Sequence, residues 1–206
     1  MAGATLVVGS LEVLGEVLKD PSVLALEQNS DVVVIPTAAA FTGALEAALA
    51  VAHVLEGRAN IETLMATDRA GCAEPYFARR VGEADLVILC DGSALHARTT
   101  WRATALGAAL GEARRVLAIG AVAGALGEVM IDPRGGAPTS GLGYRRGLVV
   151  TVPASAEQLA RTRALLGEDY VLAVLGATGV IAGDDDVWRV LGGDVVLTRA
   201  MAPASL

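Results

Sequence analysis

The stretch that decides the fold is Val116-Leu-Ala-Ile-Gly-Ala-Val-Ala-Gly-Ala-Leu-Gly-Glu-Val-Met130. Its apolar beginning predicts a buried strand that ends at Gly120, and a helix is expected to follow. Two glycines around a tight strand-to-helix turn are typical of a nucleophile elbow, which holds a serine above the sheet. Here the central residue of the turn is Val122, whose side chain cannot attack a carbonyl. The stretch therefore predicts the frame of a hydrolase without its nucleophile.

Strand and helix patterns alternate in the chain before this turn. We expect strands at residues 5–8, 32–35, 60–65 and 86–90, and helices at residues 11–18, 41–56, 75–83 and about 100–112. The helix over 41–56 has one apolar face that is expected to pack on the sheet, formed by Leu45, Leu49, Ala52 and Leu55. Alternating strands and helices with short connections are typical of an α/β fold with an open, mostly parallel, doubly wound sheet.

The chain after the turn has a different pattern of residues. Residues 132–143 are rich in glycine and proline, which predicts an irregular loop. A strand at 148–152 and a helix at 156–166 are expected next, and then strands or hairpins at 171–175, 180–181, 187–190 and 195–197. No repeat or linker interrupts the pattern, so residues 1–206 are expected to form a single domain.

Composition excludes several classes of protein. The chain has 206 residues, of which 53% are hydrophobic and only 3% aromatic, so small aliphatic side chains must fill its core. A net charge of −7 gives no basic surface for nucleic acid. The longest uncharged stretches are too short, and too often broken by glycine or proline, to span a membrane, and the N-terminus lacks the pattern of a secretory signal. Two cysteines do not make a disulfide framework, so a reduced, cytoplasmic location is expected.

The order of motifs resembles one family, the serine peptidases that include cyanophycinase and aspartyl dipeptidase. The motifs that carry the resemblance are Gly9-Ser10-Leu11-Glu12, Ile35-Pro36-Thr37-Ala38, Gly92-Ser93-Ala94-Leu95-His96, the turn around Val122, Asp132-Pro133-Arg134-Gly135-Gly136 and Gly141-Leu142-Gly143. The resemblance covers nearly the whole chain. It implies the class I glutamine amidotransferase-like fold, a three-layer α/β/α sandwich.

The catalytic positions of that family are degenerate in this chain. The resemblance places Val122 where the nucleophilic serine stands, and Pro153-Ala154 where relatives often have a Pro-His pair. The histidines of the chain are His53 and His96, both before the turn, so no later residue supplies that base. In place of an acidic pair near the C-terminus stands Leu175-Gly176-Ala177-Thr178. The resemblance therefore implies a pseudoenzyme that retains a small-molecule or peptide pocket or a protein-interaction role, as a homo-oligomer or with an active relative.

A retained pocket is expected above the turn. The backbone N–H groups of residues 121–123 could still bind an anion or a carbonyl oxygen. We expect the backbone at Val122 to have relaxed from the strained elbow conformation, because positive φ is costly for valine, and its side chain to plug part of the pocket. The residues expected to bind a ligand are Gly92, Ser93, His96, Gly120, Ala121, Val122, Ala123 and Arg134.

An alternative is an enzyme whose chemistry has moved to Asp91, Ser93 and His96, with Glu128 on the helix after the turn as an acid. Ser93 and His96 could form a nucleophile–base pair, or Cys90 could act as a thiolate. The structural interpretation is that Ser93 caps a helix, His96 bonds locally, Cys90 is a small core residue and Glu128 is solvated.

No metal or cofactor is expected. The run Asp184-Asp185-Asp186 lies between two short strand patterns and has no further ligands at a defined spacing, so a polar hairpin turn is predicted. The glycines at 120, 124 and 127 do not have the spacing of a dinucleotide-binding motif. Arg134, Arg145 and Arg146 flank the Gly-rich loop and could attract a carboxylate, but solvated side chains are the simpler expectation.

Overall fold

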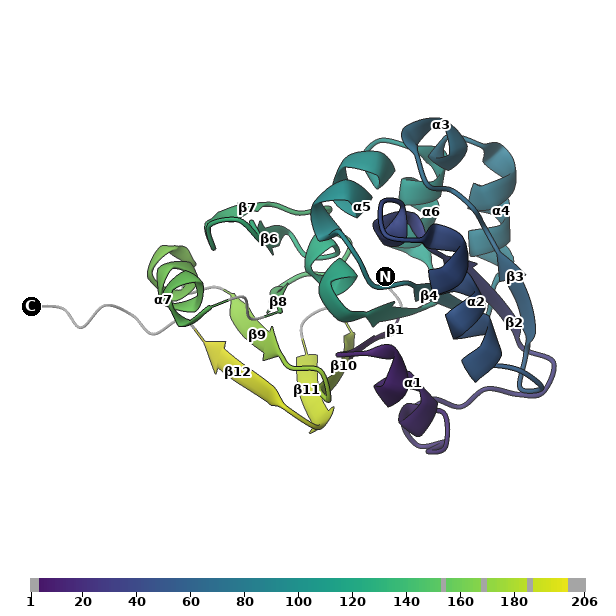
Figure 1. The fold of residues 1–206 in the computed structure, drawn as a ribbon, viewed down its shortest axis with the longest axis horizontal. Coiled ribbons are helices and arrows are strands. Elements are labelled where there is room, and N and C mark those ends of the chain that lie inside the picture. Colours follow the sequence, from purple (N-terminus) through teal and green to yellow (C-terminus); the bar gives the residue numbers. More distant parts are fainter. Residues whose placement is uncertain (1–3, 153–154, 168–169, 185–186, 200–206) are drawn as a thin grey trace, which may run out of the picture.

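A seven-stranded sheet forms the centre of the computed structural model, which describes residues 4–152, 155–167, 170–184 and 187–199 (Figure 1). The strand order is β11-β10-β1-β5-β4-β2-β3, and the five strands from β1 to β3 are parallel. The antiparallel strands β10 and β11 extend the sheet at one edge. The bounds are β1 Ala4–Val8, β2 Asp31–Ile35, β3 Asn60–Thr63, β4 Leu86–Leu89, β5 Arg115–Ile119, β10 Val180–Asp184 and β11 Val187–Gly192.

Helices cover both faces of this sheet because its central strands are apolar on both sides. In β2, for example, Val32 and Val34 point to one face, and Val33 and Ile35 point to the other. The first face is covered by α1 (Leu11–Val17) and α2 (Ala44–Val54). The second is covered by α3 (Arg69–Cys72), α4 (Pro75–Glu83), α5 (Ala94–Trp101) and α6 (Ala105–Glu112). The predicted three-layer α/β fold with a mostly parallel sheet is confirmed.

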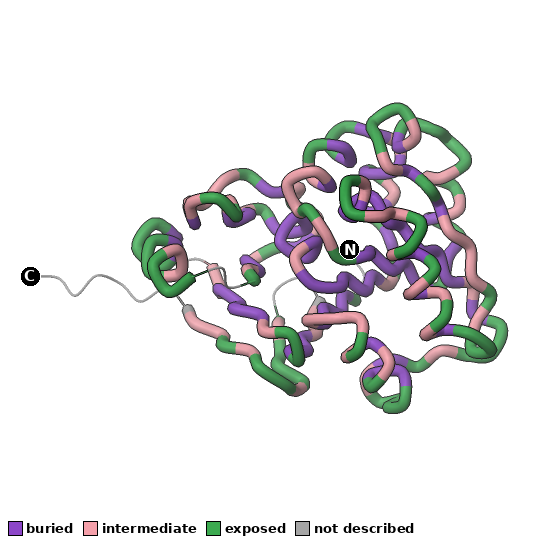
Figure 2. The backbone as a smooth tube through the Cα atoms, viewed as in Figure 1, coloured by how far each residue is buried: buried purple, intermediate pink, exposed green. Residues whose placement is uncertain are grey.

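The C-terminal part forms a smaller unit beside the sheet (Figure 1). Its three-stranded sheet has the order β12-β9-β8, with α7 packed against it. The bounds are β8 Leu148–Thr151, α7 Ala156–Leu165, β9 Val171–Leu175 and β12 Val195–Arg199. Two short strands, β6 (Val129–Ile131) and β7 (Pro138–Ser140), pair with each other. The prediction of an irregular loop over 132–143 was therefore wrong in part, because β7 lies inside it. Figure 2 shows more exposed chain here than around the central sheet.

The predicted helix over 100–112 is two helices. The break falls at residues 102–104, where Ala103 has a φ of +55°, a conformation that costs a non-glycine residue about 1–2 kcal/mol. The side chain of Thr104 caps α6 by accepting a hydrogen bond from the Gly107 N–H at 3.2 Å. No glycine or proline marks this turn. The apolar pattern of the sequence continues across it, which is why a single helix was predicted.

The predicted apolar face of α2 is buried only in part, at Leu55. Ala48, Val51 and Leu55 pack on the sheet, whereas Leu45 is 54% exposed and Leu49 is 59% exposed. A 3₁₀ turn, η1 (Thr37–Ala39), precedes the helix, which begins only at Ala44, after Gly43 with a φ of +119°. Leu45 and Leu49 are left on the outer face.

Among the described residues, no helix is both long enough and apolar enough to cross a membrane.

Candidate active-site region

The turn after β5 is a 3₁₀ helix, η2 (Gly120–Ala125), and not the beginning of an α-helix. Its left-handed residue is Gly120, with a φ of +62°. Ala103 is the one described non-glycine residue with a positive φ, so the backbone at Val122 has relaxed as expected. The strain that an elbow imposes on its central residue is therefore absent here.

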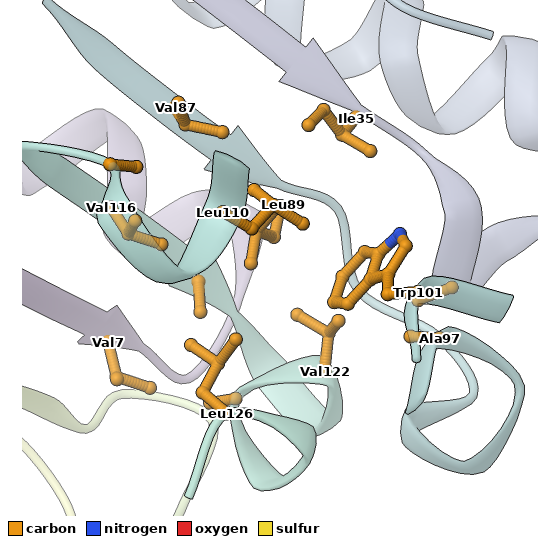
Figure 3. Close-up of a cluster of buried hydrophobic side chains, with 14 of the residues drawn as sticks. Val7, Ile35, Val87, Leu89, Ala97, Trp101, Leu110, Val116, Val122 and Leu126 are labelled. Atoms are coloured by element: carbon orange, nitrogen blue, oxygen red, sulfur yellow. The ribbon is translucent and has the colours of Figure 1, made fainter. Parts of the chain in front are cut away.

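The side chain of Val122 points into the core. It is fully buried and belongs to the cluster between the sheet and α5, where it lies beside Trp101 (Figure 3). It does not line the pocket described below. The expectation that this side chain plugs the former pocket was therefore wrong: the relaxed turn directs it towards the sheet instead.

Asp91 occupies one of the amide groups that were expected to bind a ligand, that of Ala121. Its Oδ1 accepts hydrogen bonds from the Gly92 N–H at 2.7 Å and from the Ala121 N–H at 2.8 Å. Gly120 makes this approach possible, because a Cβ at that position would overlap the Asp91 carboxylate. A carboxylate at the start of a helical turn is stabilised by the exposed N–H groups. The chain thus supplies its own anion to the Ala121 amide, and an external anion would have to displace it.

A pocket of about 140 Å³ opens beside this turn, beyond the C-terminal ends of β4 and β5. Ligands of α/β proteins usually bind at this edge of the sheet. Of the predicted binding residues, Gly92, Ser93 and Ala121 line it. The remaining lining residues, which were not among the predicted binding residues, are Ala94, Gly124, Met130, Ile131, Asp132, Pro133, Gly136, Val150, Thr151, Val152, Ser155, Gln158, Leu159 and Thr162.

Most polar side chains of the pocket are engaged in its own walls. Ser93 caps α5 by accepting from the His96 N–H at 3.1 Å, and Ser155 caps α7 by accepting from the Gln158 N–H at 3.1 Å. The amide Nε2 of Gln158 donates to the carbonyl oxygens of Pro133 and Arg134. These bonds join α7 to the turn after β6. These polar groups therefore hold the loops around the pocket in place.

Asp132 is the one ionisable side chain among the described residues that line the pocket. Its Oδ1 accepts from the Arg134 N–H at 2.9 Å, which leaves the second carboxylate oxygen for a ligand. A nucleophile–base pair needs two side chains within hydrogen-bond reach. The described lining contains no histidine, cysteine, lysine or arginine that could complete one.

His96 faces away from the pocket. Its Nε2 lies 2.9 Å from the Thr67 carbonyl oxygen and 3.4 Å from Thr100 Oγ1. Its ring contacts the ring of Phe41 edge-on, with 4.6 Å between the ring centroids. The Ser93 hydroxyl meets the backbone of His96 and not its ring, so the two side chains do not form the predicted nucleophile–base pair.

Both cysteines are buried, and burial is the main cause of their raised pKa values. The pKa of the Cys90 thiol rises to about 12, with a smaller contribution from the Asp91 charge. The pKa of Cys72 rises to about 11, also mainly through burial. The thiolate is the reactive form, so Cys90 is a core residue and not a nucleophile.

We therefore expect iodoacetamide at pH 8 to label neither thiol of the native protein over a time that labels both in denaturant. With a pKa of about 12, only on the order of one Cys90 in 10⁴ is ionised at pH 8, against roughly a quarter of an unfolded cysteine with its ordinary pKa. Intact-mass spectrometry at timed intervals checks this, with the guanidinium-unfolded protein as the control. Native labelling within tenfold of the unfolded rate would contradict the assignment.

The other candidate residues lie outside the pocket. Glu128 is exposed between η2 and β6, so its predicted position on a helix was wrong. Arg134 is exposed beside the pocket, on the turn that contains Pro133. Arg145, expected to be solvated, is buried, and its guanidinium donates to Thr5 Oγ1 and to the Tyr144 carbonyl oxygen. Arg146 is exposed as expected.

Two predicted features cannot be placed in the fold. Ala154 lies outside the described residues, as do Asp185 and Asp186 of the aspartate run. Within the described part of the chain, no group of three or more potential ligand side chains is arranged to hold a metal ion.

Two arginines that the sequence did not single out tie α5 to the Gly-rich segment. Arg98 donates to the Ser140 carbonyl oxygen at 2.5 Å, and Arg102 donates to that of Gly141 at 2.7 Å. Hydrogen bonds from a charged donor are stronger than neutral ones. They hold β7 against α5, on the side of the molecule where the pocket opens.

Solved structures share this fold. The chain is similar to a peptidase from an acI-B1 actinobacterium, with a TM-score of 0.73 and 18% identity over 98% of this chain and 92% of the other. It is also similar to a putative peptidase E protein from Listeria monocytogenes EGD-e, with a TM-score of 0.65 and 12% identity over 96% and 98% of the two chains. No protein-family model and no curated protein matches the sequence significantly. At these identities, the likeness shows a peptidase-type fold.

Proposed function

We propose that this protein is a non-catalytic relative of cyanophycinase and dipeptidase-like serine peptidases that binds a small polar molecule in the pocket beside η2. The observation that carries the proposal is the position of Val122. The residue at the centre of the former elbow is apolar, and its side chain lies in the core, outside the pocket.

Hydrolysis by a serine peptidase needs three parts around the scissile carbonyl: a nucleophile, a base that takes its proton, and N–H donors for the oxyanion. Three observations support the proposal. The resemblance puts Val122 at the nucleophile's position, the His96 ring lies against Thr67, and one of the expected oxyanion donors, the Ala121 N–H, is bonded to Asp91. Losing the nucleophile and base of such a triad costs about 10⁶-fold in rate.

The pocket suits a small ligand that donates hydrogen bonds. Met130, Ile131 and Val150 supply apolar wall, and the second carboxylate oxygen of Asp132 supplies a charged acceptor. An ammonium group or a pair of hydroxyls would satisfy that oxygen. A ligand carrying only a carboxylate would meet repulsion from Asp132. An amino acid or short peptide bound through its amino end fits both the volume and the charge.

The test combines turnover and binding in the full chain. Incubation with an α-aspartyl dipeptide, a β-aspartyl dipeptide or glutamine is expected to give no product above the uncatalysed rate. The same dipeptides are expected to bind, as detected by NMR shifts or calorimetry. Asp132→Asn should weaken binding about tenfold, since it removes the charge of a charge-assisted hydrogen bond. Glu157→Gln, which removes one exposed charge near the pocket, serves as the matched control.

Turnover abolished by a pocket substitution would overturn the non-catalytic proposal. Equal effects of Asp132→Asn and Glu157→Gln would overturn the proposed binding mode. A fluorophosphonate that labels Ser93 or Ser155 would support the alternative of displaced chemistry. The positions of His96 and Cys90 give no support to that alternative.

A specific observation favours a second role, self-association through α2. Leu45 and Leu49, four residues apart on α2, form an exposed apolar row at 54% and 59% exposure, and Phe41, on the turn before the helix, is 79% exposed. The inner face of α2 packs on the sheet and its outer face is also apolar. A helix that is apolar on two faces is typically covered by protein on both of them. We propose that a second copy of this chain covers the row.

Polar residues of the same helix fit that partner. Glu46 and His53 flank Leu49, so antiparallel pairing of two α2 helices about a twofold axis near Leu49 brings each Glu46 to the other copy's His53, which in its own chain lies 3.5 Å from Glu56. The opposed helix dipoles add to this. Light scattering is expected to show a dimer that Leu49→Glu converts to a monomer. Leu165→Glu, at a leucine of α7 with 54% exposure, should leave the dimer intact. A monomeric wild type at high concentration would contradict the proposal.

A further inference from the structure

A second pocket lies at the opposite edge of the central sheet from the one beside η2. It is about 150 Å³ and is lined by the beginnings of the parallel strands β1, β4 and β5 and by the antiparallel β10 and β11. Because parallel strands run in one direction, the beginnings and the ends of these strands lie at opposite edges. The lining residues that matter for the argument are Ala4, Leu6, Leu24, Arg115, Ala182 and Arg189.

The strand register places two arginines on either side of a shallow floor. Arg189 pairs with Ala182, and Ala182 pairs with Leu6, so these three side chains point to the same face of the sheet. Arg115 pairs with Ala4 on the strand that neighbours β1 on its other side. The two arginines are thus three strand spacings apart, or roughly 14 Å laterally. Small alanines between them leave room into which both long side chains can reach.

The charge of this pocket is opposite to that of the whole chain. The protein carries a net charge of −7, yet the ionisable side chains in this lining are both arginines. Arg115 donates to the Ala25 carbonyl oxygen at 3.1 Å, a bond that uses only one of its N–H groups. Within the described part of the chain, no carboxylate forms an ion pair with either guanidinium.

Apolar side chains complete the pocket. Val23 and Leu24, from the segment after α1, form one wall, and Leu86 contributes from the sheet. Arg115 bonds to the same segment at Ala25, which fixes this wall relative to β5. Guanidinium groups are well suited to carboxylates because their N–H groups match two oxygens. The pocket therefore combines two anion-binding groups with an apolar surface.

We propose that this pocket binds a small organic carboxylate with a compact apolar body. The carboxylate lies between the guanidinium groups of Arg115 and Arg189, and the apolar body rests on Leu6, Leu24 and the two alanines. A cavity of about 150 Å³ in another protein holds a benzene-sized molecule, so a single ring or a short branched chain fits this volume. The site is separate from the pocket beside η2 and does not depend on the function proposed for it.

Benzoate is the probe, and two relatives of it separate the contributions. Benzamide has the same shape without the charge, and acetate has the charge without the body. Calorimetry or NMR titration of the full chain is expected to show benzoate binding at least tenfold more tightly than either. Arg115→Gln and Arg189→Gln should each weaken benzoate binding at least fivefold. Arg114→Gln removes the same charge from an exposed neighbour outside the pocket and should have little effect.

The fold controls are direct, because Arg189 is exposed and its loss leaves the core unchanged. Circular dichroism and thermal unfolding of each variant confirm this before titration. Asp132→Asn, in the other pocket, should leave benzoate binding unchanged, which locates the probe. Equal binding of benzoate and benzamide would overturn the proposal. So would equal effects of Arg114→Gln and Arg115→Gln, or no measurable binding of benzoate.

Discussion

Replacing Val122 by serine is expected to lower the free energy of unfolding by about 2–4 kcal/mol and to produce no peptidase activity. The valine is fully buried between the sheet and α5 (Figure 3). Serine loses two methyl groups from this contact and places a hydroxyl where the neighbours are apolar. The hydroxyl does not reach the pocket, because the turn has relaxed and directs this side chain inwards.

Denaturant unfolding measures the change in stability, with Val122→Ala as the matched control. The alanine variant removes the methyl groups without adding a polar atom, so the difference between the two variants isolates the buried hydroxyl. Serine is expected to be the less stable of the two. Hydrolysis of an aspartyl dipeptide by Val122→Ser, or wild-type stability of that variant, would contradict the placement of this side chain.

Trp101→Ala is expected to be the most damaging single change of this core, with a loss of about 3–5 kcal/mol. The indole is fully buried, and its Nε1–H donates to Thr37 Oγ1 at 3.0 Å. Thr37 in turn donates to the Ala66 carbonyl oxygen at 2.5 Å. The tryptophan therefore joins α5 to the turn after β2 and to the segment after β3. Its loss leaves a cavity and an unpaired acceptor together.

Trp101→Phe helps to separate the two contributions, because it keeps one aromatic ring in the core and removes the N–H together with the smaller part of the indole. A loss of about 1–2 kcal/mol is expected for it. A double-mutant cycle of Trp101→Phe with Val122→Ala tests the contact in Figure 3. Contacting residues are expected to show a coupling energy of at least about 0.5 kcal/mol. Strict additivity would show that the two side chains do not pack on each other.

Much of the central fold could be predicted because its signals are local. The run at Val32–Ile35 is apolar without a break, which indicates a strand buried on both faces. All four side chains are buried in the structure. The break at Ala103 could not be predicted, because nothing in its sequence favours a positive φ. Leu45 and Leu49 were assigned to the wrong face of α2 for another reason: an 11-residue helix that is apolar on two sides does not reveal which side meets the sheet.

Only the part of the candidate site that follows β4 and β5 was predicted. Ser93 and Ala121 follow strands directly, so their place at the edge of the sheet comes from topology. The wall formed by α7 was not predicted, although Ser155, Gln158 and Thr162 recur at helical spacing and mark one polar face. The ring of His96 could not be placed, because its partner, Thr67, comes from a distant segment. Sequence spacing gives no information on such a contact.

The central claim is that Val122 belongs to the core and that its neighbour Ala121 faces the pocket. Thiol reactivity of Val122→Cys and Ala121→Cys tests it most directly, since both native cysteines are buried and give a low background. A maleimide at pH 7 is expected to label Ala121→Cys at least about 100-fold faster than Val122→Cys, because only the first thiol is accessible. Equal rates, or faster labelling of Val122→Cys, would show that position 122 still opens into the pocket and would contradict the account.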